Sequence, residues 1–213
     1  MRITDINPTK RGRFSIFVDG DFYGVLHGIV HARAGLSPGS EIAQPELDAL
    51  IEESSLIIAR EKALSLLSAR AYTERGLYDK LISFTDEEAA WQAVLRMREL
   101  GLLNDLDYAE RYAANCMDSK GYSASRTRLA LRQKGIAPEI IDEAMREFDS
   151  QDPETAIAGI ITRKYLHYLQ TESGRHKTAN ALYRKGFRLR DIQLVINNLI
   201  DDDEYYFIPE GED

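Results

Sequence analysis

An internal repeat is the feature that most constrains the fold of this chain. The segment from Leu131 to Met145, LRQKGIAPEIIDEAM, matches the segment from Leu182 to Ile196, LYRKGFRLRDIQLVI. Both have a leucine, a lysine–glycine pair, a large apolar residue after the glycine and an apolar stripe of helical period, at an offset of 51 residues. A weaker copy stands at residues 72–95, where Trp91, Val94 and Leu95 are expected to form the apolar stripe. The sequence therefore predicts three units of about 50 residues.

Each unit has the pattern of three short helices. In the middle unit the first helix is expected to begin after Asn104-Asp105, either of which can cap it. The second is expected to run from Ser123 to Lys134 and to end at Gly135, because glycine adopts a left-handed backbone without steric cost. The third is expected to start near Pro138. Three short helices bury little apolar surface, so we expect neighbouring units to pack against one another in an elongated chain of modules. The alternative is a single compact bundle with accidental similarity.

The N-terminal part has a different pattern. Arg13 to His27 contains two aromatic and β-branched runs around Asp19-Gly20, which predicts a β-hairpin. Pro45 suits the first position of a helix that we expect to reach about Ser68. The predicted fold is mainly α, with an N-terminal β-hairpin followed by tandem three-helix modules. The predicted boundaries are 1–44 for the hairpin extension, 45–103 for module 1 with its preceding helix, 104–150 for module 2, 151–200 for module 3 and 201–213 for an acidic tail.

Signatures of catalysis, metal binding or membrane insertion are scarce. Cys116 is the single cysteine, so neither an intrachain disulfide nor a multi-thiolate metal site can form, and we expect it to be buried. His27 and His31 have i, i+4 spacing but no glutamate after the first. We find no phosphate loop, dinucleotide fingerprint or nucleophile–base set. No apolar run approaches the roughly 18 residues of a membrane span, and Met1 to Lys10 lacks the apolar region of a signal peptide. We expect a cytoplasmic, non-enzymatic protein without cofactor or metal.

Basic residues are better organised. The net charge is −8, but residues 201–213 alone carry −7, whereas residues 151–200 carry +4. Two stretches without acids, Lys120–Lys134 and Arg175–Arg190, occupy equivalent places in modules 2 and 3. The candidate contact residues within them are Lys120, Arg126, Arg128, Arg132, Lys134, Arg175, Lys177, Arg184, Lys185, Arg188 and Arg190.

These stretches predict a stripe of positive potential. Such a stripe can follow a polyanion, either DNA or the acidic surface of a protein filament, and would contact DNA mainly at its phosphates. The alternative is that each basic stretch is an ordinary solvated helix face.

The residues from Gly101 to Met145 resemble the most characteristic segment of the RecX regulatory proteins of bacteria. The resemblance lies in the Leu-Asn-Asp step, the Tyr-Ala pair, the Lys-Gly-Tyr turn and the Leu-x-x-Lys-Gly-Ile ending. ITRKY, YRKGF and the VDG of the hairpin are similar to other parts of that family. Ser83-Phe84 of the first unit departs from it, since no lysine–glycine pair stands there.

The resemblance implies tandem three-helix modules and a function in the control of homologous recombination, DNA repair and the SOS response. The partner that it implies is the RecA nucleoprotein filament, whose groove such a protein binds to limit assembly, ATP hydrolysis, strand exchange and co-protease activity. We expect a monomer without membrane contact. The rival hypothesis is a stand-alone DNA-binding protein of helix-turn-helix type, since a three-helix unit with a basic helix fits that class as well.

Overall fold

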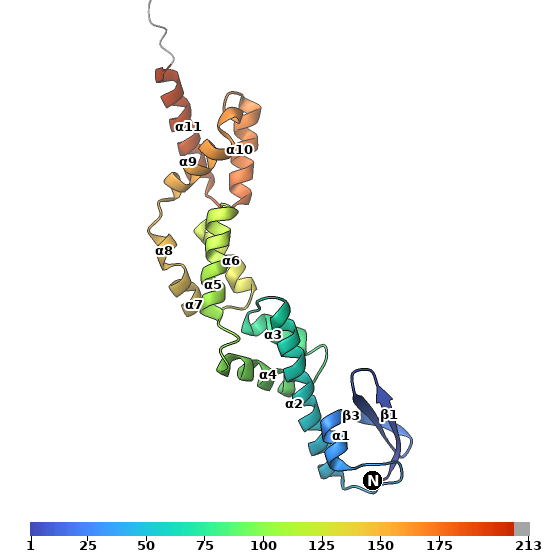
Figure 1. Cartoon of the computed structure of the whole chain (residues 1–213). Coiled ribbons are helices and arrows are strands. Elements are labelled where there is room, and N and C mark those ends of the chain that lie inside the picture. The colour runs from blue at the N-terminus through green and yellow to red at the C-terminus, as the bar shows by residue number, and fades with distance from the viewer. Residues whose placement is uncertain (207–213) are drawn as a thin grey trace, which may run out of the picture. The chain divides into compact units, whose positions relative to one another are not determined.

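The chain folds into a small N-terminal sheet followed by a series of helices (Figure 1). The computed structural model describes the backbone of residues 1–206 and the side chains of residues 1–200. Its contacts divide the chain into two compact units, Met1–Asn104 and Asp105–Asp213. The mainly helical fold with an N-terminal hairpin is confirmed. The boundaries predicted between modules stay predictions, and the side chains of the acidic tail lie outside the described residues.

The first unit begins with a three-stranded antiparallel sheet in the order β1-β2-β3. The strands are β1 (Ile3–Thr9), β2 (Arg13–Val18) and β3 (Asp21–His27). The predicted hairpin is β2–β3, and its turn has φ angles of 52° at Asp19 and 95° at Gly20, as a type I′ turn requires. Strand β1 was missed, because a register shift between Ile3 and Asp5 breaks the alternation of apolar and polar residues that marks a strand.

Helix α1 (Gly28–Ala34) leads into the long helix α2 (Gln44–Ala69), which contributes to two hydrophobic clusters. Leu47, near its start, packs with residues of the sheet, and Ala59 and Ala63, further along, pack with α3 (Glu74–Leu81) and α4 (Glu87–Glu99). The helix begins one residue before Pro45, which occupies an early position where its missing N–H costs nothing.

Helix α4 differs from the sequence prediction in the face that it buries. Trp91 was expected in the apolar stripe but is 43% exposed. Small residues beside it, Ala90 and Ala93, are fully buried instead, because α4 packs closely against α2 and α3.

The second unit contains two successive sets of helices. Module 2 comprises α5 (Asp105–Ala114), the short π-helix η1 (Asn115–Ser119), α6 (Ala124–Gln133), α7 (Pro138–Ala144) and α8 (Arg146–Asp149). Module 3 comprises α9 (Pro153–Lys164), the 3₁₀ helix η2 (Leu166–Tyr168), α10 (Glu172–Arg184) and α11 (Leu189–Tyr206), which runs past the boundary predicted at residue 200. The predicted third helix of module 2 is broken at Met145, where α7 ends and α8 begins.

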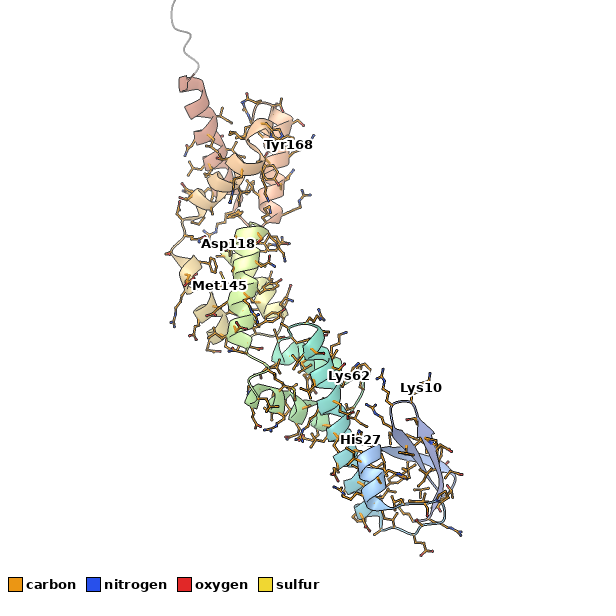
Figure 2. All side chains as sticks on the ribbon, in the orientation of Figure 1. Lys10, His27, Lys62, Asp118, Met145 and Tyr168 are labelled. Carbon is orange, nitrogen blue, oxygen red and sulfur yellow. The ribbon has the colours of Figure 1, made fainter. Side chains whose placement is uncertain are left out.

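The sequence repeat corresponds to a structural repeat. Leu131 and Leu182 are both fully buried, each in the core of its own module. Gly135 and Gly186 follow α6 and α10 with φ angles of 78° and 93°, so both are the helix-ending glycines that the sequence predicted. Met145, labelled in Figure 2, is fully buried beside the other stripe residues of module 2.

Candidate interaction surface

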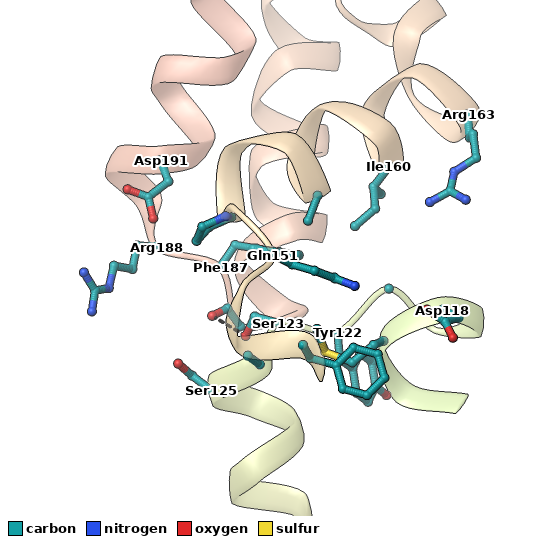
Figure 3. A pocket seen from close by; sticks show the side chains of 17 residues that line it. Asp118, Tyr122, Ser123, Ser125, Gln151, Ile160, Arg163, Phe187, Arg188 and Asp191 are labelled. Atoms are coloured by element: carbon teal, nitrogen blue, oxygen red, sulfur yellow. Dashed lines mark hydrogen bonds between the residues drawn. The ribbon is translucent and has the colours of Figure 1, made fainter. Parts of the chain in front are cut away.

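The lysine–glycine turn of module 3 lies against the start of α6 in module 2. The Ser123 N–H donates to the Lys185 carbonyl at 2.9 Å, and the Ser123 hydroxyl donates to the Gly186 carbonyl at 2.8 Å (Figure 3). The same hydroxyl oxygen caps α6 by accepting from the Arg126 N–H at 3.2 Å. One serine therefore caps its own helix and fastens the next module to it.

Gly186 is required by this contact. A Cβ atom at residue 186 would lie 2.6 Å from both Arg126 Cβ and Ser123 Oγ, a distance that real Cβ contacts essentially never show. The φ angle of 93° independently disfavours an L side chain. The lysine–glycine pair thus ends α10 and also packs between modules, a second role that sequence analysis missed.

Cations surround this junction. The Arg126 guanidinium donates to the Arg184 carbonyl, and its Cζ lies 4.4 Å from the centre of the Tyr122 ring. The Lys185 ammonium donates to the Lys120 carbonyl, and the Nζ atoms of both lysines lie 5.8 Å from the centre of the same ring. Tyr122 is therefore held among three cations.

Lys164, at the end of α9, extends this group. Burial lowers the pKa of Lys185, and repulsion from Lys164 and Arg126 lowers that pKa further. Arg163 and Lys164 were not among the predicted site residues. The available signal was their position in the last turn of α9, where cations interact favourably with the helix dipole. We call Lys120, Arg126, Arg163, Lys164 and Lys185 the junction cluster.

Two of the predicted contact residues have structural roles within their own modules. Arg128 donates to Asp142 at 2.6 Å and to Asp149 at 2.7 Å, and its side chain is only 20% exposed. The bond to Asp149 is the main reason that the pKa of Arg128 is raised. Arg175 donates through Nε to the Leu169 carbonyl at 2.8 Å. We therefore remove both arginines from the contact surface.

The other predicted residues divide into two groups. Lys134 lies over aromatic rings of α5, with Nζ 4.8 Å from the centre of Tyr112 and 5.7 Å from that of Tyr108. Outside the junction cluster, α6, α10, α11 and the turn before α11 carry further exposed cations, which we call the outer basic set. Its members are Arg132, Lys177, Arg184, Arg188 and Arg190. Arg128 and Arg132 were expected to share one face for a partner, but only Arg132 is exposed.

A cleft of about 400 Å³ opens at the junction between modules 2 and 3 (Figure 3). Tyr122, Phe148, Ile160 and Phe187 contribute apolar surface to it, and Arg188 contributes charge. A smaller cavity of about 80 Å³ adjoins it, lined on one side by η1 and the turn after it and on the other by α9 and Lys185. Four members of the junction cluster line this smaller cavity.

Other predicted features have structural explanations. His27 accepts from the Ile29 N–H through Nδ1 and caps α1, and His31 stacks on Phe14 with ring centres 4.1 Å apart. Cys116 is buried, as expected. Among the residues with described side chains, no group of three His, Cys, Asp or Glu is placed to hold a metal ion. The described helices include none that is long and apolar enough to cross a bilayer.

Comparisons with known proteins show that this chain is similar to RecX regulatory proteins. The model of the second three-helix domain of RecX matches residues 104–145. Regulatory protein RecX of Clostridium botulinum (strain Alaska E43 / Type E3) is 26% identical over 211 residues, covering 96% of this chain and 99% of its own. Regulatory protein RecX of Clostridioides difficile (strain 630) is 29% identical over 208 residues, covering 95% and 98%. A crystal structure of regulatory protein RecX, 24% identical in sequence, covers 92% of this chain and 98% of its own with a TM-score of 0.60, which shows a shared fold.

Proposed function

We propose that the chain is a member of the RecX family of regulatory proteins, to which it is similar over most of its length, and that it regulates RecA by binding the groove of the RecA nucleoprotein filament. In this proposal it limits filament assembly, ATP hydrolysis, strand exchange and co-protease activity, and it catalyses no reaction itself. The partner surface is acidic, and the outer basic set supplies the complementary charge.

The observation that supports this proposal is the serial arrangement of two basic modules. Arg132 lies at the end of α6 in module 2, while Lys177 and Arg184 lie on α10 in module 3, and all three are exposed. Ser123 fastens the modules, so the second module is held near its site once the first is bound. Contacts that are weak singly then combine into a useful affinity.

The stand-alone DNA reader is the weaker hypothesis. A recognition helix presents side chains along one face to base edges. On α6 the central cation of that face, Arg128, is instead held by Asp142 and Asp149. Sequence-selective binding to duplex DNA in the absence of RecA would favour this alternative.

The direct test is to add the protein to RecA strand-exchange and ATPase assays. We expect inhibition that rises with the ratio of protein to filament sites. No effect at several-fold excess would refute the proposal. In the variant Arg132→Glu/Lys177→Glu we expect weaker inhibition with unchanged helicity, because like charges then face the acidic partner.

A control variant separates this effect from net charge. Lys80→Glu/Arg146→Glu changes the charge equally at two exposed cations, on α3 and α8, that are outside the outer basic set. Equal loss of inhibition in both variants would mean that only the total charge matters.

A further inference from the structure

The cleft between modules 2 and 3 combines an apolar floor with charged walls. Its volume of about 400 Å³ lies within the roughly 300–1,000 Å³ that is typical of ligand sites. Phe148, Ile160 and Phe187 supply apolar surface, and Figure 3 shows Arg163 and Arg188 at its two sides. The cleft therefore suits a ligand that carries both large apolar groups and negative charge.

The surroundings of the cleft have an excess of positive charge. Its two arginines are matched by two acids that also line it, Asp118 and Asp191. The smaller cavity beside it adds three lysines, which are Lys120, Lys164 and Lys185. None of these side chains takes part in a salt bridge within residues 1–200. Five cations thus face two acids, and the excess favours an acidic ligand.

The C-terminal segment of this chain has the matching composition. Tyr205 to Pro209, YYFIP, is aromatic and apolar, and it is preceded directly by the acidic run Asp201–Glu204. Three more acids lie within the next four residues, EGED. An apolar run bounded by acids is complementary to an apolar cleft bounded by cations.

This segment cannot reach the cleft of its own molecule. Asp191, in the first turn of α11, lines the cleft, and α11 continues to Tyr206. That length of helix spans about 22 Å, at a rise of about 1.5 Å per residue. From Tyr206 to Ile208 an extended chain covers at most about 7 Å. A contact within one molecule would require most of α11 to unwind, so the occupant has to come from a second molecule.

We propose that residues 205–209 of a second copy of this chain bind in the cleft. Phe207 and Ile208 enter the apolar interior, while the acids on either side of them face Arg163, Arg188 and the lysines of the smaller cavity. Two copies exchange their segments reciprocally, so that both clefts of a closed dimer are filled and each contact supports the other. The monomer expected from the sequence is then the form that exists at low concentration.

Sedimentation velocity of the full chain tests the proposal over an about hundredfold range of concentration, with RecA absent. The native chain should change from monomer to dimer as its concentration rises. In Phe207→Ser/Ile208→Ser we expect the dissociation constant to rise at least about tenfold, because two large apolar side chains are no longer buried in the dimer. The control Ile29→Ser/Leu64→Ser replaces apolar side chains that are 67% and 47% exposed on α1 and α2, and it should dimerise as the native chain does.

A mixture of two deficient variants identifies the contact itself. Ser125 is exposed and lines the cleft, so Ser125→Phe should fill the mouth of the cleft and weaken the dimer while the C-terminal segment stays intact. Mixed with Phe207→Ser/Ile208→Ser, it should form heterodimers in which one intact segment fills one intact cleft. The mixture should therefore associate more strongly than either variant alone.

Three results would each overturn the proposal. They are a native chain that stays monomeric throughout the range, a Phe207→Ser/Ile208→Ser variant that dimerises as the native chain does, and a mixture that associates no better than its components. Since no RecA is present, these results are separate from those of the filament assays.

Discussion

Replacing Gly186 with alanine should loosen module 3 from module 2. The new methyl group would meet Arg126 Cβ and Ser123 Oγ at 2.6 Å, and Arg126 Cβ can move only with the backbone of α6. If module 3 moves away from α6 to relieve this clash, the two hydrogen bonds that Ser123 donates across the junction are broken. The residue would also have to keep a φ angle of 93° with a side chain attached.

The chain offers a matched control for the backbone part of this cost. Gly39 has a φ angle of 94°, but a Cβ there would meet nothing within 4 Å. Gly39→Ala should therefore cost only the conformational term of about 1–2 kcal/mol. Gly186→Ala should cost about 1–3 kcal/mol more, either as overpacking or as two lost hydrogen bonds.

Hydrogen exchange measures this difference where it arises. The Ser123 amide donates to the Lys185 carbonyl, so it should be protected in the native chain and in Gly39→Ala, and exposed to exchange in Gly186→Ala. Amides in the core of each module should remain protected in all three proteins. If the two variants lose equal stability in urea and the Ser123 amide stays protected in both, the junction does not depend on Gly186 and the argument fails.

Three further predictions concern single side chains. Arg128→Gln should lower the free energy of unfolding by only about 1 kcal/mol in urea titrations, because its partner Asp149 is half exposed. The same variant should inhibit RecA as the native chain does. A folded variant that no longer inhibits would show that Arg128 belongs to the contact surface. Asp152 caps α9, and the hydrogen bonds of this cap lower the pKa of its carboxyl group. The contribution of Asp152 to stability is therefore present above about pH 3.9 and disappears as the pH falls through the folded pKa. In a circular-dichroism titration with acid, the stability of Asp152→Asn should depend less on pH than that of the native chain. Burial, with Cys116 nearby, raises the pKa of Tyr112 to about 12, so the contribution of Tyr112 to stability is complete below about pH 10 and is lost as the pH rises through 12. An ultraviolet titration of Tyr112→Phe should therefore lack a tyrosine that ionises near pH 12, and a Tyr112 that ionises near pH 10 would contradict its burial.

Local patterns in the sequence were sufficient for most of the helices. Ser123 caps α6 and Gly135 follows its end as predicted, because a helix cap depends on residues within one turn. Gly20 likewise located the β2–β3 turn. Strand β1 was not predicted because its bulge breaks the alternation of apolar and polar residues, and its hydrogen bonds to β2 hold it in the sheet.

The surface was less predictable from sequence than the fold. Arg128 appeared to lie in a stretch without acids, yet the carboxylates that bind it lie 14 and 21 residues further along the chain. Arg163 and Lys164 lay outside both basic stretches, and only the packing of α9 near Lys185 made them part of a charged cluster. The net charge of a stretch therefore did not show which cations were free for a partner.

The sequence by itself determined the repeated module, because helix caps, helix-ending glycines and apolar stripes act within a few residues of each other. Only the tertiary structure decided what the repeated lysine–glycine pair does in module 3. There Gly186 permits a close approach to Ser123, and Lys185 is directed to a carbonyl of the preceding module. Contacts between residues about 60 apart in the chain depend on how whole modules pack, and no local pattern encodes that packing.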